Sequence, residues 1–538
     1  MDMNEHIERN KEGKKIHPSI FEPSAFIVNL LCAILGAIIG MQLVTTLGVT
    51  PNTSIIGALI AMLIARLPVS IFNKFKSIHR QNIVQTSISS ATFGAANSLM
   101  IPIGIPFLIG KPDLVIPMLL GTAAAMFIDA TVLYNMYDSK IFPAEGAWPP
   151  GVATAQSIIA GDEGGKKAGL LGVGAVVGLI GSYMNVSMSA FGISFIGNIW
   201  ALFMFGVGLL CRQYSGSLFG INVDKLYIPH GVMIGAGIIA IIQIFVVILN
   251  SQKKTLNGSN EKEGHYTRSI SHFKRTFVLG YVAYLIVAAL IALASGLFTK
   301  MSPGMLIGFI IYAAVAAFVH ELLVGIASMH SGWFPAFAIA FITLTIGMLV
   351  GFPPLALAIL AGFSAATGPA FADMGYDLKA GYILRGNGKD KEYEILGRKH
   401  QYIAGIFAFC VAVIVVLLSY KGYFAQNLLP PVDKVYVSTI EAGASPEVAK
   451  QLLIWMVPGI VLQLVGGPSR QLGIMFATGL LITSPNACWA VLVGILIRSI
   501  VIKTKGKEAE AAMSIFAAGV IAGDALYSFF NSMFKLKK

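Results

Sequence analysis

Ionisable side chains inside long apolar runs are the residues of this chain best suited to chemistry. His320 and Glu321 interrupt the run AAVAAFVHELLVGIASMH, which ends at His330. An ionisable group at the centre of a membrane helix costs about 2.5–3.5 kcal/mol on insertion scales, so each such group needs a reason. Carboxylates and imidazoles in this setting are typical of proteins that move protons or bind a polar substrate.

Three aspartates extend this set. Asp129 and Asp373 lie late in two apolar segments that each precede a Tyr-Asp-x-Lys tetrapeptide, and Asp524 lies in the closing run AAGVIAGDALYSFF. We name these aspartates, with His320 and Glu321, as candidates for proton coupling. The alternative for each is a residue hydrogen-bonded to a neighbouring helix near the membrane interface, although the matching positions of Asp129 and Asp373 favour function for this pair.

The tetrapeptide itself occurs at 137–140 (YDSK) and at 376–379 (YDLK), each time after small residues and after four apolar segments. This agreement of position predicts two related halves, a pattern typical of transporters whose site lies between repeats. Tyr376, which opens the second copy, is a candidate substrate contact. Because the second copy stands near the basic residues 398–400, we expect it to mark a cytoplasmic helix end.

Two further segments supply polar candidates for substrate binding. In 142–156 (FPAEGAWPPGVATAQ), a Pro-rich approach joins a short helix whose free amides, with Thr154 and Gln156, could hold a carboxylate or a metal chelate; Glu145 lies in the same segment. In 466–470 (GGPSR), Arg470 is the matching candidate of the second half. A structural turn is the alternative for both segments, and His330 completes the set of candidate substrate contacts.

Enzyme motifs are incomplete. His320-Glu321 begins like the zinc motif HExxH, but Val324 stands where the second histidine is required. The sequence 521–524 (IAGD) resembles the GxGD motif of intramembrane aspartyl proteases, but Ile521 replaces its first glycine. No P-loop occurs. We therefore predict no catalytic residue, no cofactor and no metal site.

Composition defines the elements that must position these residues. Of 538 residues, 56% are hydrophobic and 12% charged, which predicts an all-α polytopic membrane protein rather than a soluble chain. About 20 apolar residues are needed to cross a bilayer. Sixteen candidate transmembrane or half-spanning segments follow: 26–47, 54–72, 83–109, 114–134, 168–188, 195–210, 227–249, 277–298, 305–327, 333–350, 353–372, 402–419, 452–465, 472–483, 487–502 and 511–530. The shorter apolar piece 151–161 is flanked by Pro and Gly and is either re-entrant or an additional crossing.

Charge sets the expected topology. The net charge of +12 comes from short basic clusters beside apolar runs, which follows the positive-inside pattern and argues against nucleic-acid binding. We expect a cytoplasmic N-terminal tail at 1–22 without a cleavable signal peptide, a first membrane half at 23–250, a cytoplasmic linker at 251–275 and a second half at 276–538. A multi-pass protein of the cell membrane is predicted, and a homo-oligomer is left open.

Several motifs, in this order, resemble the oligopeptide transporter (OPT) family, which includes the yellow stripe-like metal-chelate carriers. They are 137–143 (YDSKIFP) with 153–155 (ATA), 228–231 (IPHG), 373–382 (DMGYDLKAGY) and 518–524 (AGVIAGD). The short N-terminal tail resembles a prokaryotic branch. The resemblance implies a secondary transporter of about sixteen helices, driven by protons, that imports small peptides or amino-acid-derived substrates, metal chelates included. A channel or passive pore is the alternative, and an intramembrane protease a weaker one.

Overall fold

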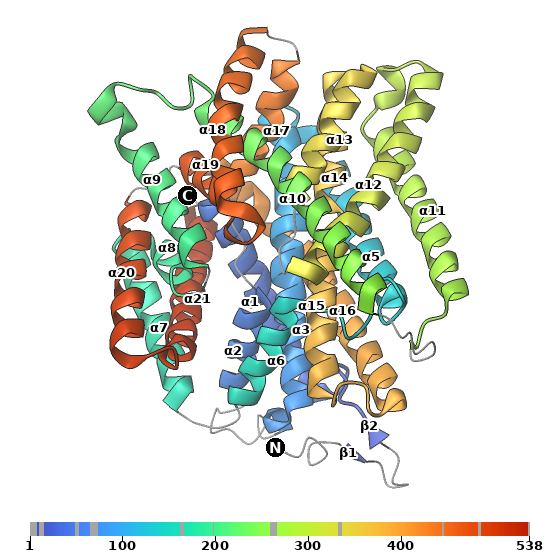
Figure 1. Cartoon of the computed structure of the whole chain (residues 1–538), viewed down its shortest axis with the longest axis vertical. Helices are drawn as coiled ribbons and strands as arrows, with labels where there is room; N and C mark the ends of the chain where they lie inside the picture. Colours follow the sequence, from blue (N-terminus) through green and yellow to red (C-terminus); the bar gives the residue numbers. More distant parts are fainter. Residues whose placement is uncertain are drawn as a thin grey trace.

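The computed structural model shows an all-α protein, as composition predicts (Figure 1). It describes residues 8–9, 15–48, 53–64, 74–161, 166–196, 198–258, 266–331, 336–443, 446–482 and 486–535. Within these ranges, the strands β1 (Glu8–Arg9) and β2 (Lys15–Ile16) pair antiparallel outside the helical bundle. Nine helices of the described ranges are long and apolar enough to cross a membrane, which agrees with a polytopic fold.

The helices follow the predicted apolar segments closely, with shifted ends. Their bounds are α1 (Pro23–Leu47), α2 (Thr53–Ile64), α3 (Ile78–Phe93), α4 (Ile101–Leu108), α5 (Val115–Met136), α6 (Pro149–Gly161), α7 (Lys166–Tyr183), α8 (Met188–Ile193), α9 (Ile199–Phe219), α10 (Ile228–Gly258), α11 (Ile270–Ala294), α12 (Pro303–Ser331), α13 (Ala336–Val350), α14 (Pro354–Ala366), α15 (Pro369–Leu384), α16 (Lys391–Ala425), α17 (Pro431–Ala442), α18 (Pro446–Arg470), α19 (Leu472–Leu481), α20 (Ala487–Lys505) and α21 (Ala509–Lys535).

Three differences from the predicted segments matter for function. The run predicted at 83–109 is one long span, Ile78–Leu108, in which the π-helical turn η3 (Gly94–Met100) joins α3 to α4. The run predicted at 353–372 is broken into α14 and α15. Helix α17 was not predicted, because the charged residues Asp433, Lys434 and Glu441 interrupt its apolar pattern.

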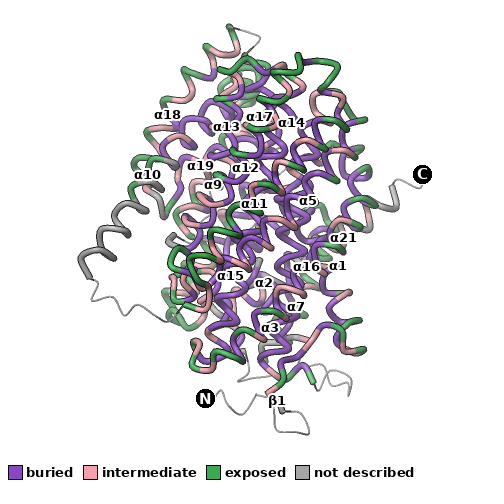
Figure 2. The backbone as a smooth tube through the Cα atoms, turned by 90° about the vertical axis from the view of Figure 1, so that its right-hand side faces the viewer, coloured by how far each residue is buried: buried purple, intermediate pink, exposed green. Residues whose placement is uncertain are grey.

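Helices from distant parts of the sequence pack together in pairs. α7 packs on α21, α9 on α19 and α10 on α18, so both sequence halves contribute to each pair. Small residues allow this close approach: a Cβ at Gly178 would collide with the carbonyl oxygen of Val520, and one at Gly235 with that of Met456. Figure 2 shows that buried residues follow the inner helices, whereas exposed residues follow the outer turns.

The two Tyr-Asp-x-Lys copies have different structures, and the expectation that the second copy ends a helix is wrong. In the first copy, Tyr137 caps α5 and Asp138 takes a left-handed conformation (φ 64°) in a turn. In the second copy, Asp377 is fully buried in the middle of α15, which continues to Leu384. The reason is the break before Pro369, which starts a new helix so late that the tetrapeptide falls inside it.

Candidate functional site

A helix break in the protein interior organises the site. α14 ends at Ala366 and α15 begins at Pro369, with Gly368 between them at φ 97° and ψ −38°. Glycine is required there, because a Cβ would be strained at this φ and would lie 2.9 Å from the Cβ of Val324. The break exposes backbone amides at the start of α15, whose helix dipole favours a negative charge.

Asp129 of α5 supplies that charge. Its Oδ2 accepts a hydrogen bond of 2.6 Å from the backbone N–H of Gly368, and its Oδ1 accepts one from the hydroxyl of Tyr284 on α11. The same hydroxyl contacts Oε2 of Glu321 on α12. Asp129, Tyr284 and Glu321 are all fully buried. We call Asp129 and Glu321, which are joined by the hydroxyl of Tyr284, the tyrosine-bridged pair.

The number of hydrogens available between Tyr284, Asp129 and Glu321 determines how this pair is protonated. A tyrosine hydroxyl carries one hydrogen, whereas an ionised carboxylate is an acceptor only. Tyr284 can therefore donate to Asp129 or to Glu321, and its other contact needs a proton on the carboxyl group. The arrangement is satisfied when the two carboxyl groups share one proton in addition to that of Tyr284.

His320, which precedes Glu321 in α12, is directed to a different neighbour. Its Nε2 lies 2.9 Å from the carbonyl oxygen of Ala336 at the start of α13, and its Nδ1 lies 3.0 Å from Oγ1 of Thr367. Because a carbonyl can only accept, Nε2 donates in the first contact. His320 thus holds α12 and α13 against the helix break, and these two hydrogen bonds do not involve the carboxyl groups of Asp129 or Glu321.

A second pair of carboxylates, Asp373 and Asp377, lies on the face of α15 that meets α3 and α2. Ser89 donates to Oδ1 of Asp373 over 2.6 Å. Three donors converge on Asp377, all from α2 and α3: Gln85 at 2.5 Å and Ser54 at 3.2 Å to Oδ1, and Ser90 at 3.4 Å to Oδ2. Both carboxylates are fully buried. We call them the serine-lined pair.

A hydrogen-bond chain leads from the serine-lined pair toward the α15–α16 connection. Gln401 of α16 donates to the carbonyl oxygen of Asp377 over 2.7 Å and accepts from Arg385 over 2.7 Å. Arg385 in turn forms a buried, two-point ion pair with Glu394 (2.7 and 3.1 Å). Since Arg385 and Glu394 neutralise each other, the chain reaches the serine-lined pair without bringing it a free positive charge.

The N-terminal segment covers this end of the site. Lys15 forms an ion pair with Asp390, and the hydrogen bond from Lys15 holds the pKa of Asp390 below its usual range. The centroid of the His17 ring lies 5.6 Å from that of His400, on which it stacks, and 5.5 Å from those of Tyr393 and His79. Burial lowers the pKa of His17 well below its ordinary value, and the nearby Arg385 lowers it further. We call residues 15–22 the N-terminal strap.

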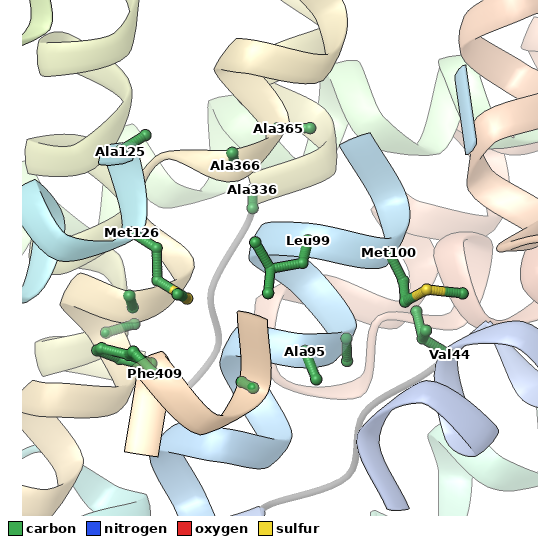
Figure 3. Close-up of a cluster of buried hydrophobic side chains, with 14 of the residues drawn as sticks. Val44, Ala95, Leu99, Met100, Ala125, Met126, Ala336, Ala365, Ala366 and Phe409 are labelled. Carbon is green, nitrogen blue, oxygen red and sulfur yellow. The ribbon is translucent and has the colours of Figure 1, made fainter. Parts of the chain in front are cut away.

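Apolar side chains surround the carboxylates. Figure 3 shows Ala125 and Met126 of α5, Leu99 of η3 and Ala366 of α14 among the buried hydrophobic side chains at the centre of one cluster. All four belong to one buried hydrophobic cluster. Small side chains at this centre bring α5, η3 and α14 close to the helix break, and they give the polar groups a setting of low dielectric constant.

The structure brings four of the five proton-coupling candidates to the helix break or to α15: Asp129, His320, Glu321 and Asp373. Asp524 lies elsewhere, where its carboxylate accepts from the backbone N–H of Ser189 over 3.0 Å and from the Ser189 hydroxyl. That pairing of α21 with α8 agrees with the structural alternative for Asp524.

The substrate-contact candidates are scattered. Tyr376 is buried against the indole of Trp148 (6.0 Å between ring centroids), and Thr154 is buried in α6, where it donates to the carbonyl oxygen of Pro150. Glu145 and Gln156 are exposed, and exposed Arg470 lies over the ring of Trp200 at 5.5 Å. The side chain of His330 lies outside the described residues.

Most hydrogen-bond partners of the buried carboxylates were not predicted from the sequence. Tyr284 lies in a run with no other sign of function, and Gln401 follows a basic cluster. α3 carried the clearest signal: its sequence IHRQNIVQTSISSATF is polar along most of its length, and every residue is buried. A buried polar helix inside a membrane protein needs partners, so this density of Gln, Ser and Thr could have identified α3 as part of the site.

The chain was compared with known proteins. A family model described as OPT oligopeptide transporter protein matches residues 23–219 and 212–535, which together cover most of the chain. No curated protein matches it.

Proposed function

Because this chain belongs to the OPT oligopeptide transporter family, we propose that it is a proton-coupled secondary transporter that imports small peptides or amino-acid-derived substrates, metal chelates included. We further propose that it resides in the cell membrane with its N-terminus in the cytoplasm. The two sequence halves, 23–250 and 276–538, would then be joined by a cytoplasmic linker.

The observation that supports proton coupling best is the tyrosine-bridged pair. Two buried carboxyl groups meet at one hydroxyl, so this arrangement retains one proton. Losing that proton would leave two buried negative charges facing the same oxygen, which favours separation of α5, α11 and α12. Gain and loss of one proton are thereby linked to the packing of three helices, as proton-driven transport requires.

The helix break relates this proton to a substrate. Asp129 accepts the hydrogen bond of the backbone N–H of Gly368 at the start of α15. Free amides at a half-helix start are the groups that bind substrate carboxylates in other transporters. In our proposal, a substrate carboxylate competes with Asp129 for this helix start, and Asp129 takes up a proton when it is displaced. Tyr376 and Thr154 remain candidate contacts from α15 and α6.

Two alternatives fit the structure less well. An aspartyl protease needs two aspartates that act together, but Asp377 bonds to α2 and α3 whereas Asp524 bonds to α8. A passive pore needs no group that gains and loses a proton, so it leaves the tyrosine-bridged pair without a purpose.

The test is uptake of small peptides into proteoliposomes that contain the purified protein. We expect saturable uptake that rises with an inward proton gradient, together with counterflow of preloaded substrate. A protonophore should reduce uptake to the level of equilibration. Uptake that is indifferent to the protonophore contradicts proton coupling, and the absence of both saturation and counterflow favours a pore.

A further inference from the structure

The serine-lined pair lacks a positive partner. In the part of the chain that the structure describes, the ion pairs formed by lysine and arginine involve other carboxylates: Glu22, Asp138, Asp224, Asp390, Glu394 and Glu510. The nearby Lys379 of α15 donates instead to the carbonyl oxygen of Ala144 over 2.9 Å. Two buried carboxylates on one helix face therefore need another source of positive charge.

The hydrogen bonds around this pair favour its ionised form. The hydroxyls of Ser54, Ser89 and Ser90 and the amide of Gln85 all donate toward the carboxylates, and donors stabilise a carboxylate rather than a carboxylic acid. The tyrosine-bridged pair also has two carboxyl groups, but its donors in the described part of the chain are the hydroxyl of Tyr284 and the backbone N–H of Gly368. The serine-lined pair thus has enough donors to hold one of its carboxyl groups ionised, a single charge that a monovalent cation can neutralise.

One carboxylate oxygen remains available. Oδ2 of Asp373 is buried and has no hydrogen-bond partner among the described residues, although Asp373 itself is fully buried. Around it lie hard oxygen atoms: Oδ1 of the same carboxylate and the hydroxyl oxygen of Ser89, which is 2.8 Å from that of Ser54. A buried carboxylate oxygen without a partner, close to hydroxyl oxygens, is chemically suited to a hard cation.

From these observations we propose that Asp373, Asp377, Ser54, Ser89 and Ser90 form a binding site for a monovalent alkali cation, with Na⁺ as the ion to test. The cation would contact the open oxygen of Asp373 and the lone pairs of the serine hydroxyls. Asp377, which already receives bonds from Gln85, Ser54 and Ser90, would act mainly through its charge.

A single positive charge fits this site better than a double one. Calcium takes six to eight oxygen ligands, with carboxylates contacting it directly, and magnesium keeps several water molecules. Here one carboxylate is occupied by donors, and the remaining oxygen atoms belong mostly to neutral hydroxyls. A compact, partly neutral ligand set of this kind matches a monovalent ion.

Cation binding would join three helices. Ser54 belongs to α2, Ser89 and Ser90 to α3, and both aspartates to α15, the helix that starts at Gly368. Figure 1 shows α2, α3 and α15 side by side in the centre of the bundle, and these helices are in contact. Occupation of the site would therefore stabilise the half-helix whose first amide binds Asp129. Coupling to transport rests on the proposed function, whereas cation binding does not.

The test is thermal unfolding of the purified full-length protein in detergent, without transport substrate. Melting temperature is measured while NaCl replaces choline chloride at constant ionic strength, with KCl and CaCl₂ as parallel series. We expect a saturable rise with Na⁺ that choline does not produce. Asp373→Asn should abolish the rise, and Ser90→Ala should shift its midpoint to higher Na⁺ concentration.

Controls make the result decisive. Ser499→Ala removes a serine hydroxyl that bonds only to its own helix, at the carbonyl oxygen of Ile495, and should retain the full Na⁺ response. If Asp373→Asn fails to fold, Ser90→Ala and Ser89→Ala still test the site. Equal responses to Na⁺ and choline, a response to Ca²⁺ alone, or a full Na⁺ response in the serine variants would overturn the proposal. Failure of peptide uptake with an intact Na⁺ response would count against the transport function only.

Discussion

The two buried pairs have the same number of carboxyl groups and the same burial but different surroundings. In the tyrosine-bridged pair, Asp129 and Glu321 come from different helices and meet at the single hydroxyl of Tyr284. In the serine-lined pair, Asp373 and Asp377 come from one helix and receive bonds from several serine and glutamine side chains. Because burial is the same, the number of donors is the difference on which we base the proposed proton site and the proposed cation site.

The largest effect that this comparison predicts is on stability when the shared hydroxyl is removed. Tyr284→Phe leaves the facing oxygens of two buried carboxyl groups without their common partner, at a cost of about 1–3 kcal/mol for an unsatisfied buried group. Ser90→Ala should cost less, because Asp377 keeps its bonds to Gln85 and Ser54. Denaturation of both variants in detergent measures the difference.

Tyr281→Phe, one turn earlier in α11, is the matched control and should be close to wild type. The double variant Tyr284→Phe with Glu321→Gln should recover part of the loss, because it replaces one of the two facing carboxyl groups with a neutral amide that can donate a hydrogen bond. If Ser90→Ala proves as costly as Tyr284→Phe, the two pairs do not differ in the way described.

The next effect concerns transport. Glu321→Gln replaces a carboxyl group that can exchange a proton with an amide that cannot, while the amide still reaches Tyr284. Each proton coupled to transport contributes about 1.4 kcal/mol per pH unit of gradient. If the variant couples one proton fewer per transport cycle, the accumulation ratio of the substrate should fall about tenfold per pH unit. Substrate exchange without a gradient should persist.

Accumulation ratios and exchange rates in proteoliposomes separate these outcomes. Glu441→Gln changes an exposed carboxylate of α17 and serves as the control, with accumulation like that of the wild type. Equal loss of gradient-driven uptake and of exchange in Glu321→Gln would instead indicate that Glu321 has a structural role.

The smallest effect concerns the N-terminal strap. Its response to pH must be distinguished from the pH responses of the two carboxylate pairs. The folded-state pKa of His17 is lowered, so the unfolded chain binds this proton more readily. The stabilising contribution is therefore complete above the ordinary histidine pKa of about 6.5 and is lost as the pH falls below it. We expect the N-terminal strap to release below this pH, as a local rather than a global opening.

Hydrogen exchange of residues 15–22 as a function of pH measures this release. His17→Gln should remove most of its pH dependence. Lys15→Gln breaks the ion pair to Asp390 but keeps the imidazole, and should preserve that dependence. Release with an unchanged pH profile in His17→Gln would contradict the role of this histidine.

The repeated tetrapeptide shows how far sequence similarity extends. Its two copies share three residues, but Asp138 lies in a turn, where it accepts from Thr267 and lies 3.4 Å from Arg398, whereas Asp377 is buried among serines inside α15. The tetrapeptide was a valid landmark for the site, since Tyr376 opens its second copy and Asp373 precedes it by one turn. Its own conformation depended on where the helix break fell, a position that the dipeptide Gly368-Pro369 marks but that the predicted segment 353–372 ran across.

The sequence alone determined the membrane class, most helices and the few buried ionisable residues. These follow from hydrophobicity and from the cost of placing a charge in lipid, which are properties of each segment by itself. Tertiary structure decided the partners: Tyr284 with Asp129 and Glu321, and Gly368 with Asp129, across 155, 37 and 239 positions of sequence. Such contacts depend on which helices pack together and at which rotation. Small residues and the strained glycine at the break set that packing, so only the folded chain distinguishes the proposed proton site from the proposed cation site.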